Sequence, residues 1–440
     1  MNPVPLPKGF EKSLSMIDEV HRKQLMDALE DKSPTSIRIN SRKFDFDGEL
    51  ETVHWSDHGY YLQERPTFNS DPFWHAGVYY VQEASSMVIG SIVGKLRKQF
   101  EGNIRVLDLC ASPGGKSTDI ADALLEVDVL VSNDVINSRV RPLQENVVRW
   151  GKLNHFITNQ DAKYFQQKSG LFDLMVIDAP CSGEGMFRKD PKARTEWSED
   201  LIRLCHARQV RILNDSWSTL KEGGYLIYST CTFNEIENEL TISKFLESND
   251  AELVELDFDE AWNIHQNGTG FFRLFPNLCR GEGFSFCVLK KLEEAPRPKR
   301  KMSSKKPKSI QMFDMDLVER DGSLFPASID LVSDLDVIYS GMELGVFKKS
   351  KFLPAHRLAM LSSVNFQIEF RESELTYSQS IQFLRKEGFE LDGEKGFTLL
   401  KYRNQNLGWI NHLGNRFNNL YPTNMRILTR ADYTQDPNIL

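Results

Sequence analysis

The sequence predicts an α/β protein whose central part is a parallel β-sheet covered by helices. Between residues 104 and 291, short apolar runs alternate with segments of helical spacing, which favours right-handed strand–helix–strand units. The chain has 440 residues, 40% of them hydrophobic and 26% charged, so it can bury a sizeable core. We expect roughly two to four domains from this length. The composition excludes collagen-like, mucin-like and wholly disordered proteins.

The central elements can be assigned from these alternating runs. Five apolar runs are expected to be buried strands: Ile104–Ala111, Val129–Ser132, His155–Thr158, Leu174–Ile177 and Tyr225–Tyr228. Segments with helical spacing are Lys116–Leu125, Ser138–Trp150, Leu201–Leu220 and Ile236–Ser248. In parallel sheets of this kind, ligands bind beyond the carboxyl ends of the strands. The residues that follow each strand are therefore the candidates for a functional site.

The two flanking regions have different patterns. Residues 1–85 contain a helical stretch at Glu11–Leu29 and a strand at Pro34–Asn40, so we expect a small α+β appendage there. Residues 310–440 mix short strand-like runs with Gly and Asn turns, which predicts a compact β-rich module. Its expected strands are Val337–Tyr339, Phe397–Leu400 and Leu407–Ile410.

A basic linker is predicted at residues 292–309. Within it, the run from Pro296 to Lys308 holds basic residues and no acidic one. The basic residues are Arg297, Lys299, Arg300, Lys301, Lys305, Lys306 and Lys308. Such a run is a solvated tether, a tether that also contacts phosphates, or, in a eukaryotic host, a nuclear address.

Several classes of protein are disfavoured by what the chain lacks. No run reaches the eighteen or so apolar residues of a membrane helix, and the first residues do not resemble a secretory signal, so we expect a cytoplasmic protein. The six cysteines form no CxxC pair, which disfavours a disulfide framework and a zinc site. Because the net charge is −8, any nucleic-acid binding must use local basic surfaces.

A glycine-rich turn follows the first predicted strand, at residues 108–117. Its GGKS segment resembles the tail of a P-loop, but Cys110 stands where the first glycine should be and Pro113 removes a backbone donor. The dinucleotide pattern G-x-G-x-x-G is also absent. What remains is a turn suited to the amino-acid end of a nucleoside ligand, with Lys116 able to meet a carboxylate. A tight turn without a ligand is the alternative.

Acidic residues follow the next two predicted strands. Asp134 can accept hydrogen bonds from the hydroxyls of a ribose, and Asp161 can accept from an exocyclic amine such as that of adenine. Taken singly, each acid is more often a turn residue or a helix cap. Together with the glycine turn, they favour a nucleoside cofactor.

Thiols follow the last two predicted strands, where Asp178 and Cys181 follow one and Cys231 follows the other. A lone cysteine at a strand end is usually a small core residue, and metal binding is a second alternative. Two thiols beside a nucleoside site also suit covalent catalysis on a pyrimidine. A thiolate that adds to C6 makes C5 nucleophilic toward an electrophilic methyl group, and a carboxyl group at N3 would stabilise the adduct.

Three motifs occur in order: Asp-x-Cys-Ala-Ser-Pro-Gly-Gly-Lys at 108–116, Asp-Ala-Pro-Cys-Ser-Gly-Glu-Gly-Met-Phe at 178–187 and Ser-Thr-Cys-Thr at 229–232. In combination they resemble the motifs of the NOL1/NOP2/Sun family of RNA cytosine-C5 methyltransferases. Segments 34–40 and 75–87 are similar to the family's N-terminal region, so the resemblance covers roughly residues 5–291. More weakly, 407–409 and 414–422 resemble the bacterial 16S ribosomal RNA methyltransferase F group, in which a PUA-like RNA-binding module follows.

The resemblance implies a domain plan. Residues 1–85 would be an N-terminal RNA-binding appendage, 86–291 a Rossmann-like class I methyltransferase domain, and 310–440 a PUA-like RNA-binding region. One departure is visible, because many family members have histidines where this chain has Asn277 and Phe284. The fold should survive this difference, but fine substrate recognition can differ.

The resemblance also implies the roles of the site residues. Cys231 would be the nucleophile, Cys181 the second thiol that helps to resolve the covalent adduct, and Asp178 a contact of the target base. The residues that would line S-adenosylmethionine are Cys110, Ala111, Ser112, Pro113, Gly114, Gly115, Lys116, Asp134, Asp161 and Asp178.

The function expected from these observations is methyl transfer from S-adenosylmethionine to cytosine C5 in structured RNA. Small-subunit ribosomal RNA (16S) or a ribosomal subunit is favoured as the partner, because the C-terminal region resembles that group. Methylation of transfer RNA, a non-catalytic RNA-binding factor in ribosome assembly and a P-loop-like NTPase are the alternatives. We expect a monomer without a metal or a membrane partner.

Overall fold

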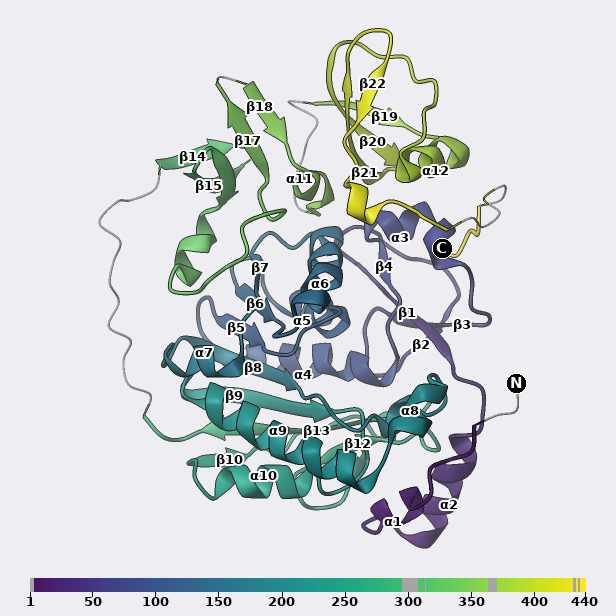
Figure 1. The fold of residues 1–440 in the computed structure, drawn as a ribbon, viewed down its shortest axis with the longest axis vertical. Helices are drawn as coiled ribbons and strands as arrows, with labels where there is room; N and C mark the ends of the chain where they lie inside the picture. The colour runs from purple at the N-terminus through teal and green to yellow at the C-terminus, as the bar shows by residue number, and fades with distance from the viewer. Residues whose placement is uncertain are drawn as a thin grey trace.

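The computed structural model describes residues 4–294, 308–312, 314–349, 351–362, 370–429, 433 and 436–440. Within these residues the strands form four sheets, and the largest one lies at the centre of the molecule (Figure 1). The expected α/β class, with a Rossmann-like central domain and smaller units on either side in the chain, is confirmed. None of the described helices is long and apolar enough to cross a bilayer.

All five strands predicted for the central part are present and run parallel to one another. They are β5 (Arg105–Asp108), β6 (Val129–Asn133), β7 (His155–Thr158), β8 (Phe172–Asp178) and β9 (Leu220–Thr230). Their order in the sheet is β9-β8-β5-β6-β7. Because the order reverses beside β5, loops after neighbouring strands diverge and leave a crevice at the carboxyl edge.

Helices cover both faces of this sheet because its strands are apolar on both sides. Alternate residues point to opposite faces, so Leu107 packs with α7, α9 and α10, whereas Val106 packs with α4 and α5. These helices are α4 (Val88–Arg97), α5 (Gly115–Ala123), α7 (Ala162–Gln166), α9 (Glu199–Trp217) and α10 (Glu239–Leu246). A further helix, α6 (Asn137–Trp150), packs against the C-terminal region through a separate apolar cluster.

The sheet continues beyond β9 with antiparallel strands that the sequence analysis did not assign. These are β10 (Ala251–Leu253), β11 (His265–Gln266), β12 (Phe272–Leu274) and β13 (Phe284–Lys291). In the register of β9 and β13, Thr230 lies opposite Ser285. The loop between β12 and β13 therefore lies at the same edge as the residues that follow β9.

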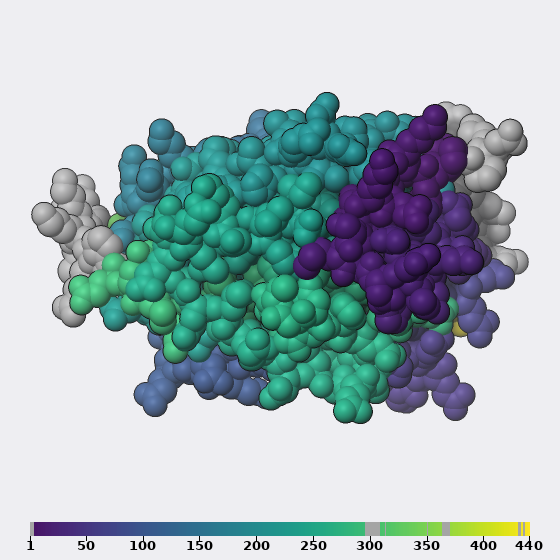
Figure 2. Space-filling view, turned by 90° about the horizontal axis from the view of Figure 1, so that it is seen from below, coloured from purple at the N-terminus to yellow at the C-terminus, as the bar shows by residue number. Residues whose placement is uncertain are grey.

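The N-terminal appendage has two short helices where one was expected. Asp18 accepts hydrogen bonds from the N–H groups of Val20 and His21, and this cap begins α2 (Glu19–Ala28) after α1 (Phe10–Ser13) has ended. Both helices pack against the central domain, where they form the purple ridge of Figure 2. The appendage continues with β1 (Thr35–Ile39), β2 (Glu51–Thr52), β3 (Gly59–Leu62), α3 (Pro72–Ala76) and β4 (Tyr79–Tyr80).

The C-terminal region contains two separate sheets (Figure 1). The first unit has β14 (Lys308–Met312), β15 (Met315–Arg320), β16 (Ser323–Pro326), β17 (Gly345–Lys348), β18 (Lys351–Pro354) and α11 (His356–Met360). The second has β19 (Arg371–Glu374), α12 (Tyr377–Arg385), β20 (Gly396–Tyr402), β21 (Gln405–His412) and β22 (Phe417–Asn419). The predicted strands at 397–400 and 407–410 are parts of β20 and β21.

Two predictions for this region need comment. The segment Val337–Tyr339 is not a strand of the C-terminal sheets. Instead Val337 makes a single bridge to Thr158 and the N–H of Ile338 donates to the carbonyl of Ile157 at 2.8 Å, which covers the edge strand β7. The predicted linker 292–309 lies mostly outside the described residues, and β14 already begins at Lys308.

Candidate active site

A cavity of about 580 Å³ lies beyond the carboxyl ends of β5 to β9, and we call it the strand-end cavity. Each parallel strand contributes to its lining. The predicted site residues that line it are Cys110, Asp134, Asp161, Asp178, Cys181 and Cys231. The turn residues Ala111 to Lys116 do not line it. The strand-end argument therefore identified one shared site, although part of the glycine turn faces elsewhere.

The two thiols that follow β8 and β9 are in direct contact. The Sγ atoms of Cys181 and Cys231 are 3.2 Å apart, and the N–H of Gly185 donates to the carbonyl of Cys231 at 2.8 Å. The hydrogen bond with Cys231, together with burial, raises the pKa of Cys181 well above its usual value. Cys181 therefore keeps its proton at neutral pH and can donate it to the sulfur of Cys231.

Asp178 is held by a cation and a hydroxyl. Lys116 Nζ is 2.9 Å from Asp178 Oδ2, and the hydroxyl of Ser229 donates to Asp178 Oδ1 at 3.0 Å. Burial opposes the charge of Lys116, but Asp178 and Cys231 favour it and the net pKa of Lys116 is raised. Lys116 does meet a carboxylate, as its position suggested, and within this structure the carboxylate is that of Asp178. A cation therefore lies beside both the carboxylate and the thiols.

The glycine turn packs against helix α6. Gly114 has a φ of 110°, and a Cβ atom there would lie 3.2 Å from a methyl group of Leu143, so this position favours glycine. Ser117, in the first turn of α5, donates to Asp108 at 2.6 Å. Burial raises the pKa of Asp108 to about 7, and its Oδ1 atom has no hydrogen-bond partner among the described residues. The turn thus positions α5 and Lys116.

The acidic residues after β6 and β7 accept local hydrogen bonds from the backbone and also line the cavity. Asp134 accepts from the N–H groups of Ile136 at 2.9 Å and Ser112 at 3.3 Å. Asp161 caps α7 and pairs with Arg211 at 3.2 Å. Burial favours a higher pKa for Asp161, but the hydrogen bond from Lys163 and the pairing with Arg211 outweigh it, so the pKa of Asp161 is lowered. These hydrogen bonds do not remove the two acids from the cavity, because both residues line it.

Other residues at the site were not singled out by the sequence analysis. Arg139 from α6 and Arg208 and Arg211 from α9 also line the cavity. They stand in helices with helical spacing, so only the fold shows that they face the strand ends. Glu184, described next, also had no role in the sequence analysis. Its place within the motif at 178–187 was the one feature of the sequence that pointed to it.

Two buried carboxylates hold the loops that carry the thiols. Glu184 accepts from the N–H of Phe233 at 2.6 Å and from the indole N–H of Trp197 at 3.1 Å. Glu237 accepts from the N–H of Ser182 at 3.0 Å, and burial raises its pKa to about 7. Each carboxylate contacts the loop that carries the other strand's thiol, so the two loops are fixed relative to each other.

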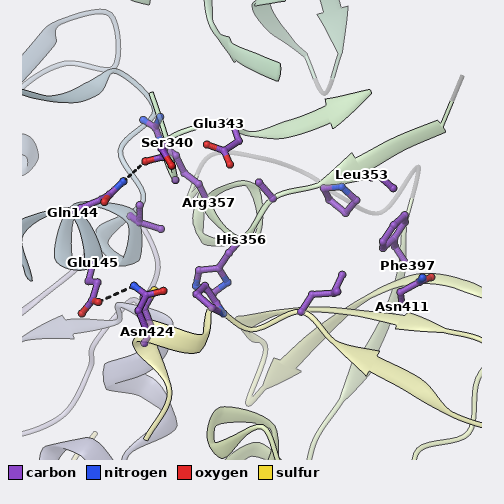
Figure 3. A pocket seen from close by; sticks show the side chains of 17 residues that line it. Gln144, Glu145, Ser340, Glu343, Leu353, His356, Arg357, Phe397, Asn411 and Asn424 are labelled. Atoms are coloured by element: carbon purple, nitrogen blue, oxygen red, sulfur yellow. Dashed lines mark hydrogen bonds between the residues drawn. The ribbon is translucent and has the colours of Figure 1, made fainter. Parts of the chain in front are cut away.

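A larger cavity of about 680 Å³ lies between α6, the first C-terminal unit and the second C-terminal unit (Figure 3). His356, Glu343 and Asn424 are among its lining residues, and Asn424 donates to Glu145 at 2.8 Å (Figure 3). No cysteine lines it, so it does not offer the thiol chemistry of the strand-end cavity. Across the described parts of the chain, no three His, Cys, Asp or Glu side chains are grouped so as to hold a metal ion.

With this geometry in hand, comparison with known proteins identifies the family. Residues 96–290 match the model of the 16S rRNA methyltransferase RsmB/F family. Residues 6–84 match the N-terminal domain of 16S rRNA methyltransferase RsmF, and residues 370–427 match the methyltransferase RsmF PUA domain. A relative from Shewanella sediminis, the ribosomal RNA small subunit methyltransferase F, is 31% identical, with 89% of this chain and 90% of the relative covered. The chain belongs to this family.

Further relatives agree with the assignment. The ribosomal RNA small subunit methyltransferase F of Vibrio cholerae is 29% identical and covers 95% of this chain and 97% of its own length. A methyltransferase homologue from Pyrococcus horikoshii has a TM-score of 0.53 at 25% identity and covers 65% of this chain and 99% of its own length. NSun6 from the same organism has a TM-score of 0.56 at 18% identity and covers 66% of this chain and 100% of its own length. At this identity it supports the fold alone.

Family membership confirms that the chain is a methyltransferase with a C-terminal PUA domain. The PUA match covers the second C-terminal unit, and residues 308–361 lie outside the three matched ranges. The predicted domain boundaries and the roles of the individual site residues stay predictions.

Proposed function

We propose that this methyltransferase acts on cytosine C5 in 16S ribosomal RNA, with S-adenosylmethionine as the methyl donor and Cys231 as the nucleophile. The observation that carries the proposal is the contact between the Cys231 and Cys181 sulfurs beside the Lys116–Asp178 pair. Relatives that share nearly the whole chain are named ribosomal RNA small subunit methyltransferase F, which supports the substrate. With a ribosomal substrate, we expect the activity in the cytoplasm.

The strand-end cavity fits a nucleoside with a charged amino-acid end. Asp134 offers carboxylate oxygens for ribose hydroxyls, and Ile136, Ala162 and Ile212 offer apolar walls for a base. Asp161 and Gln160 lie where an exocyclic amine could donate. When bound, S-adenosylmethionine supplies an electrophilic methyl group.

The reaction begins at Cys231. Its thiolate adds to C6 of the cytosine, so that a C–S bond forms and the electron pair of the C5–C6 bond becomes available at C5. C5 takes the methyl group as the bond from the methyl carbon to the donor sulfur breaks, and the donor leaves as a neutral thioether. The C5 proton is then removed by a base, and the C6–S bond breaks to regenerate the thiolate. Since stacking hides C6 within a helix, the cytosine must be unpaired or flipped out.

Asp178 and Cys181 assist these steps. The side chain of Asp178 is 27% exposed, so it can contact the N3 edge of the base while Lys116 balances its charge. Cys181 retains its proton and can donate it to the departing Cys231 sulfur at 3.2 Å. Hydrogen bonding to the leaving thiolate favours release of the methylated RNA.

The test is methyl transfer from radiolabelled S-adenosylmethionine to small-subunit RNA, followed by bisulfite sequencing. We expect label on cytosine with the wild type and none with Cys231→Ala, while donor binding is retained. Cys287→Ala is the control, because this buried thiol on β13 lies away from the cavity lining and should leave transfer intact. Full activity of Cys231→Ala would refute the assigned nucleophile.

The substrate is tested by running the same assay on three substrates: free 16S RNA, assembled small subunits and transfer RNA. We expect transfer to ribosomal RNA in at least one of the first two. Transfer restricted to transfer RNA would refute the ribosomal substrate while keeping the chemistry. Absence of transfer to all three, with measurable donor binding, would favour a non-catalytic role in ribosome assembly.

A further inference from the structure

A polar cavity of about 440 Å³ lies between the N-terminal appendage and the loop that joins β12 to β13. We call it the basic cavity. Its charged and amide lining residues include Asp31, Lys32, Arg65, Arg188, Asn277 and Arg280. None of these residues lines the strand-end cavity, so this is a separate site.

The amide of Asn277 is the first unusual feature of the basic cavity. Both of its side-chain polar atoms, Oδ1 and Nδ2, are buried and have no hydrogen-bond partner within the described residues. Leaving a buried polar group unpaired lowers stability, so nearly all such groups have partners in folded proteins. An amide that lines a cavity and keeps one acceptor and two donors free is suited to pairing with a ligand.

The charge of the basic cavity is the second feature. Arg188 is paired with Glu282 at 3.0 Å, and Arg280 is paired with Glu51. Lys32 and Arg65 are both exposed and make no ion pair with any residue that the structure describes. Arg65 lies 5.4 Å from the ring centre of Phe68, which leaves its guanidinium donors available. With Asp31 as the acidic lining residue, two unpaired cations remain for an anion such as phosphate.

The basic cavity is connected to the catalytic loops through a short chain of contacts. Arg188 donates to the carbonyl of Gly281, in the loop that lines the basic cavity. The carbonyl oxygen of Gly283 lies close to Gly185: a Cβ atom built on Gly185 would be only 2.9 Å from that oxygen. Gly185 in turn donates to the carbonyl of Cys231 at 2.8 Å. The loop that lines the basic cavity is therefore in contact with the loops that carry the thiols.

We propose that the basic cavity binds an unpaired nucleotide of the RNA, next to the target cytosine along the strand. Lys32 and Arg65 contact its phosphate, and the Asn277 amide pairs with its base edge. Single-stranded RNA is read through such base edges and phosphates, and a paired donor and acceptor on one amide match a base that offers both. The inference rests on the proposed function, because it takes the methyltransferase substrate to be RNA.

The first experiment measures kcat and KM for methyl transfer to a short RNA that contains the target cytosine. Lys32→Ala and Arg65→Ala should each raise KM about 3- to 10-fold with kcat within about twofold, and each should reduce the salt dependence of RNA binding. Lys98→Ala is the matched control. This exposed lysine follows α4, beside residues that line a hollow at the amino ends of the strands, and its removal should leave KM unchanged.

The second experiment tests Asn277 against the RNA. Each nucleotide beside the target is replaced in turn by an abasic residue, in wild type and in Asn277→Ala. At one position the abasic residue should raise KM about tenfold for the wild type and add nothing in the variant, because the same contact is already lost. The proposal would be overturned if, at every position, the abasic residue raised KM by the same factor in Asn277→Ala as in the wild type. It would also be overturned if the Lys32, Arg65 and Asn277 variants all had a KM within twofold of wild type.

The two failures can be told apart. If the wild type transfers no methyl group to RNA, the proposed function fails, whatever the basic cavity does. If transfer is normal but the variants of Lys32, Arg65 and Asn277 behave like Lys98→Ala, only this inference fails. A defect on assembled subunits that is absent on free RNA would point to a protein partner in the basic cavity and would also overturn the proposal. Thermal unfolding of each variant checks that the fold is intact.

Discussion

The sulfur atoms of Cys181 and Cys231 lie 3.2 Å apart, although 50 residues separate them along the chain. Strands β8 and β9 are parallel neighbours, and Asp178 lies opposite Ser229 in their register. Residues a few positions beyond these two must therefore meet at the same edge of the sheet. The contact suits the two thiols to different roles, because Cys181 keeps its proton and can donate it to the sulfur of Cys231.

Cys181→Ala should trap a covalent complex between the protein and its RNA. Without the hydrogen bond from Cys181, the Cys231 sulfur leaves C6 less readily, whereas its addition to C6 requires no contact with residue 181. We expect a band of protein-linked RNA on denaturing electrophoresis with this variant. Its turnover should fall about 100-fold or more, in the range of a lost catalytic proton donor.

The double variant Cys181→Ala/Cys231→Ala is the control for this band, which should disappear with the nucleophile. If Cys181→Ala forms no adduct although it binds RNA and donor, the second thiol does not act in release. An adduct that survives in the double variant would instead contradict the role of Cys231.

Lys116→Gln should lower kcat/KM for methyl transfer by about 10- to 100-fold, equivalent to about 1.4–2.8 kcal/mol of transition-state stabilisation. The ammonium group lies 2.9 Å from Asp178 and balances its charge beside the thiols. Glutamine keeps much of the length but removes the charge, so it separates electrostatics from packing. Lys116→Arg keeps the charge and should recover part of the rate. Activity of Lys116→Gln within twofold of wild type would remove the cation from the mechanism.

Gly185→Ala should damage the active site through the backbone alone. A Cβ atom at this position would lie 2.9 Å from the carbonyl oxygen of Gly283 and 3.1 Å from that of Cys231, and both are main-chain atoms. Relief requires the two loops to separate, so we expect a loss of about 1–3 kcal/mol in unfolding free energy and at least a tenfold loss of methyl transfer. Urea unfolding and initial rates measure the two effects.

Gly388→Ala is the matched control for this substitution. Nothing lies within 4 Å of a Cβ atom built at Gly388, and the residue is exposed, so stability and rate should change little. Equal effects of the two alanine variants would show that crowding at Gly185 is not what matters.

Much of the site could be predicted because it depends on a general property of parallel sheets. The apolar runs fixed where the strands lie, and the polar residues after them converge at one edge. Cys110, Asp134, Asp161, Asp178, Cys181 and Cys231 accordingly line one cavity. The segment Ala111–Lys116 was expected there as well, but it packs against α6 and acts through Lys116.

Other features depend on contacts between distant segments and left no local pattern. Strand β13 is recognised by its pairing with β9, where Ser285 lies opposite Thr230, and the loop before β13 lines the basic cavity. The helix expected at residues 11–29 is broken because Asp18 caps a new one. The apolar triplet at residues 337–339 forms no strand of the C-terminal sheets. It makes hydrogen bonds to the edge strand β7 instead.

The buried His75 should make the protein less stable in mild acid. It is 2% exposed, and its Nε2 atom donates to the carbonyl of Asn69 at 3.0 Å while Nδ1 accepts from the hydroxyl of Tyr421 at 3.2 Å. Burial and the nearby charge of Arg149 lower the pKa of His75 to about 3. The unfolded chain protonates this histidine near pH 6.5 and the native protein does not, so its contribution to stability is lost as the pH falls below about 6.5.

The measurement compares wild type with His75→Gln, which preserves a donor but cannot titrate. At pH 8 the variant should be less stable, because one of the two hydrogen bonds is lost. At pH 5 the unfolding free energy of the wild type should fall by about 2 kcal/mol relative to that of the variant, since only the unfolded wild-type chain gains a proton there. The difference between the two proteins should therefore shrink or change sign. Urea unfolding at the two pH values gives these free energies, and the exposed His54→Gln should track the wild type at both. A constant gap between wild type and His75→Gln across this range would mean that the native protein protonates His75 as readily as the unfolded chain does.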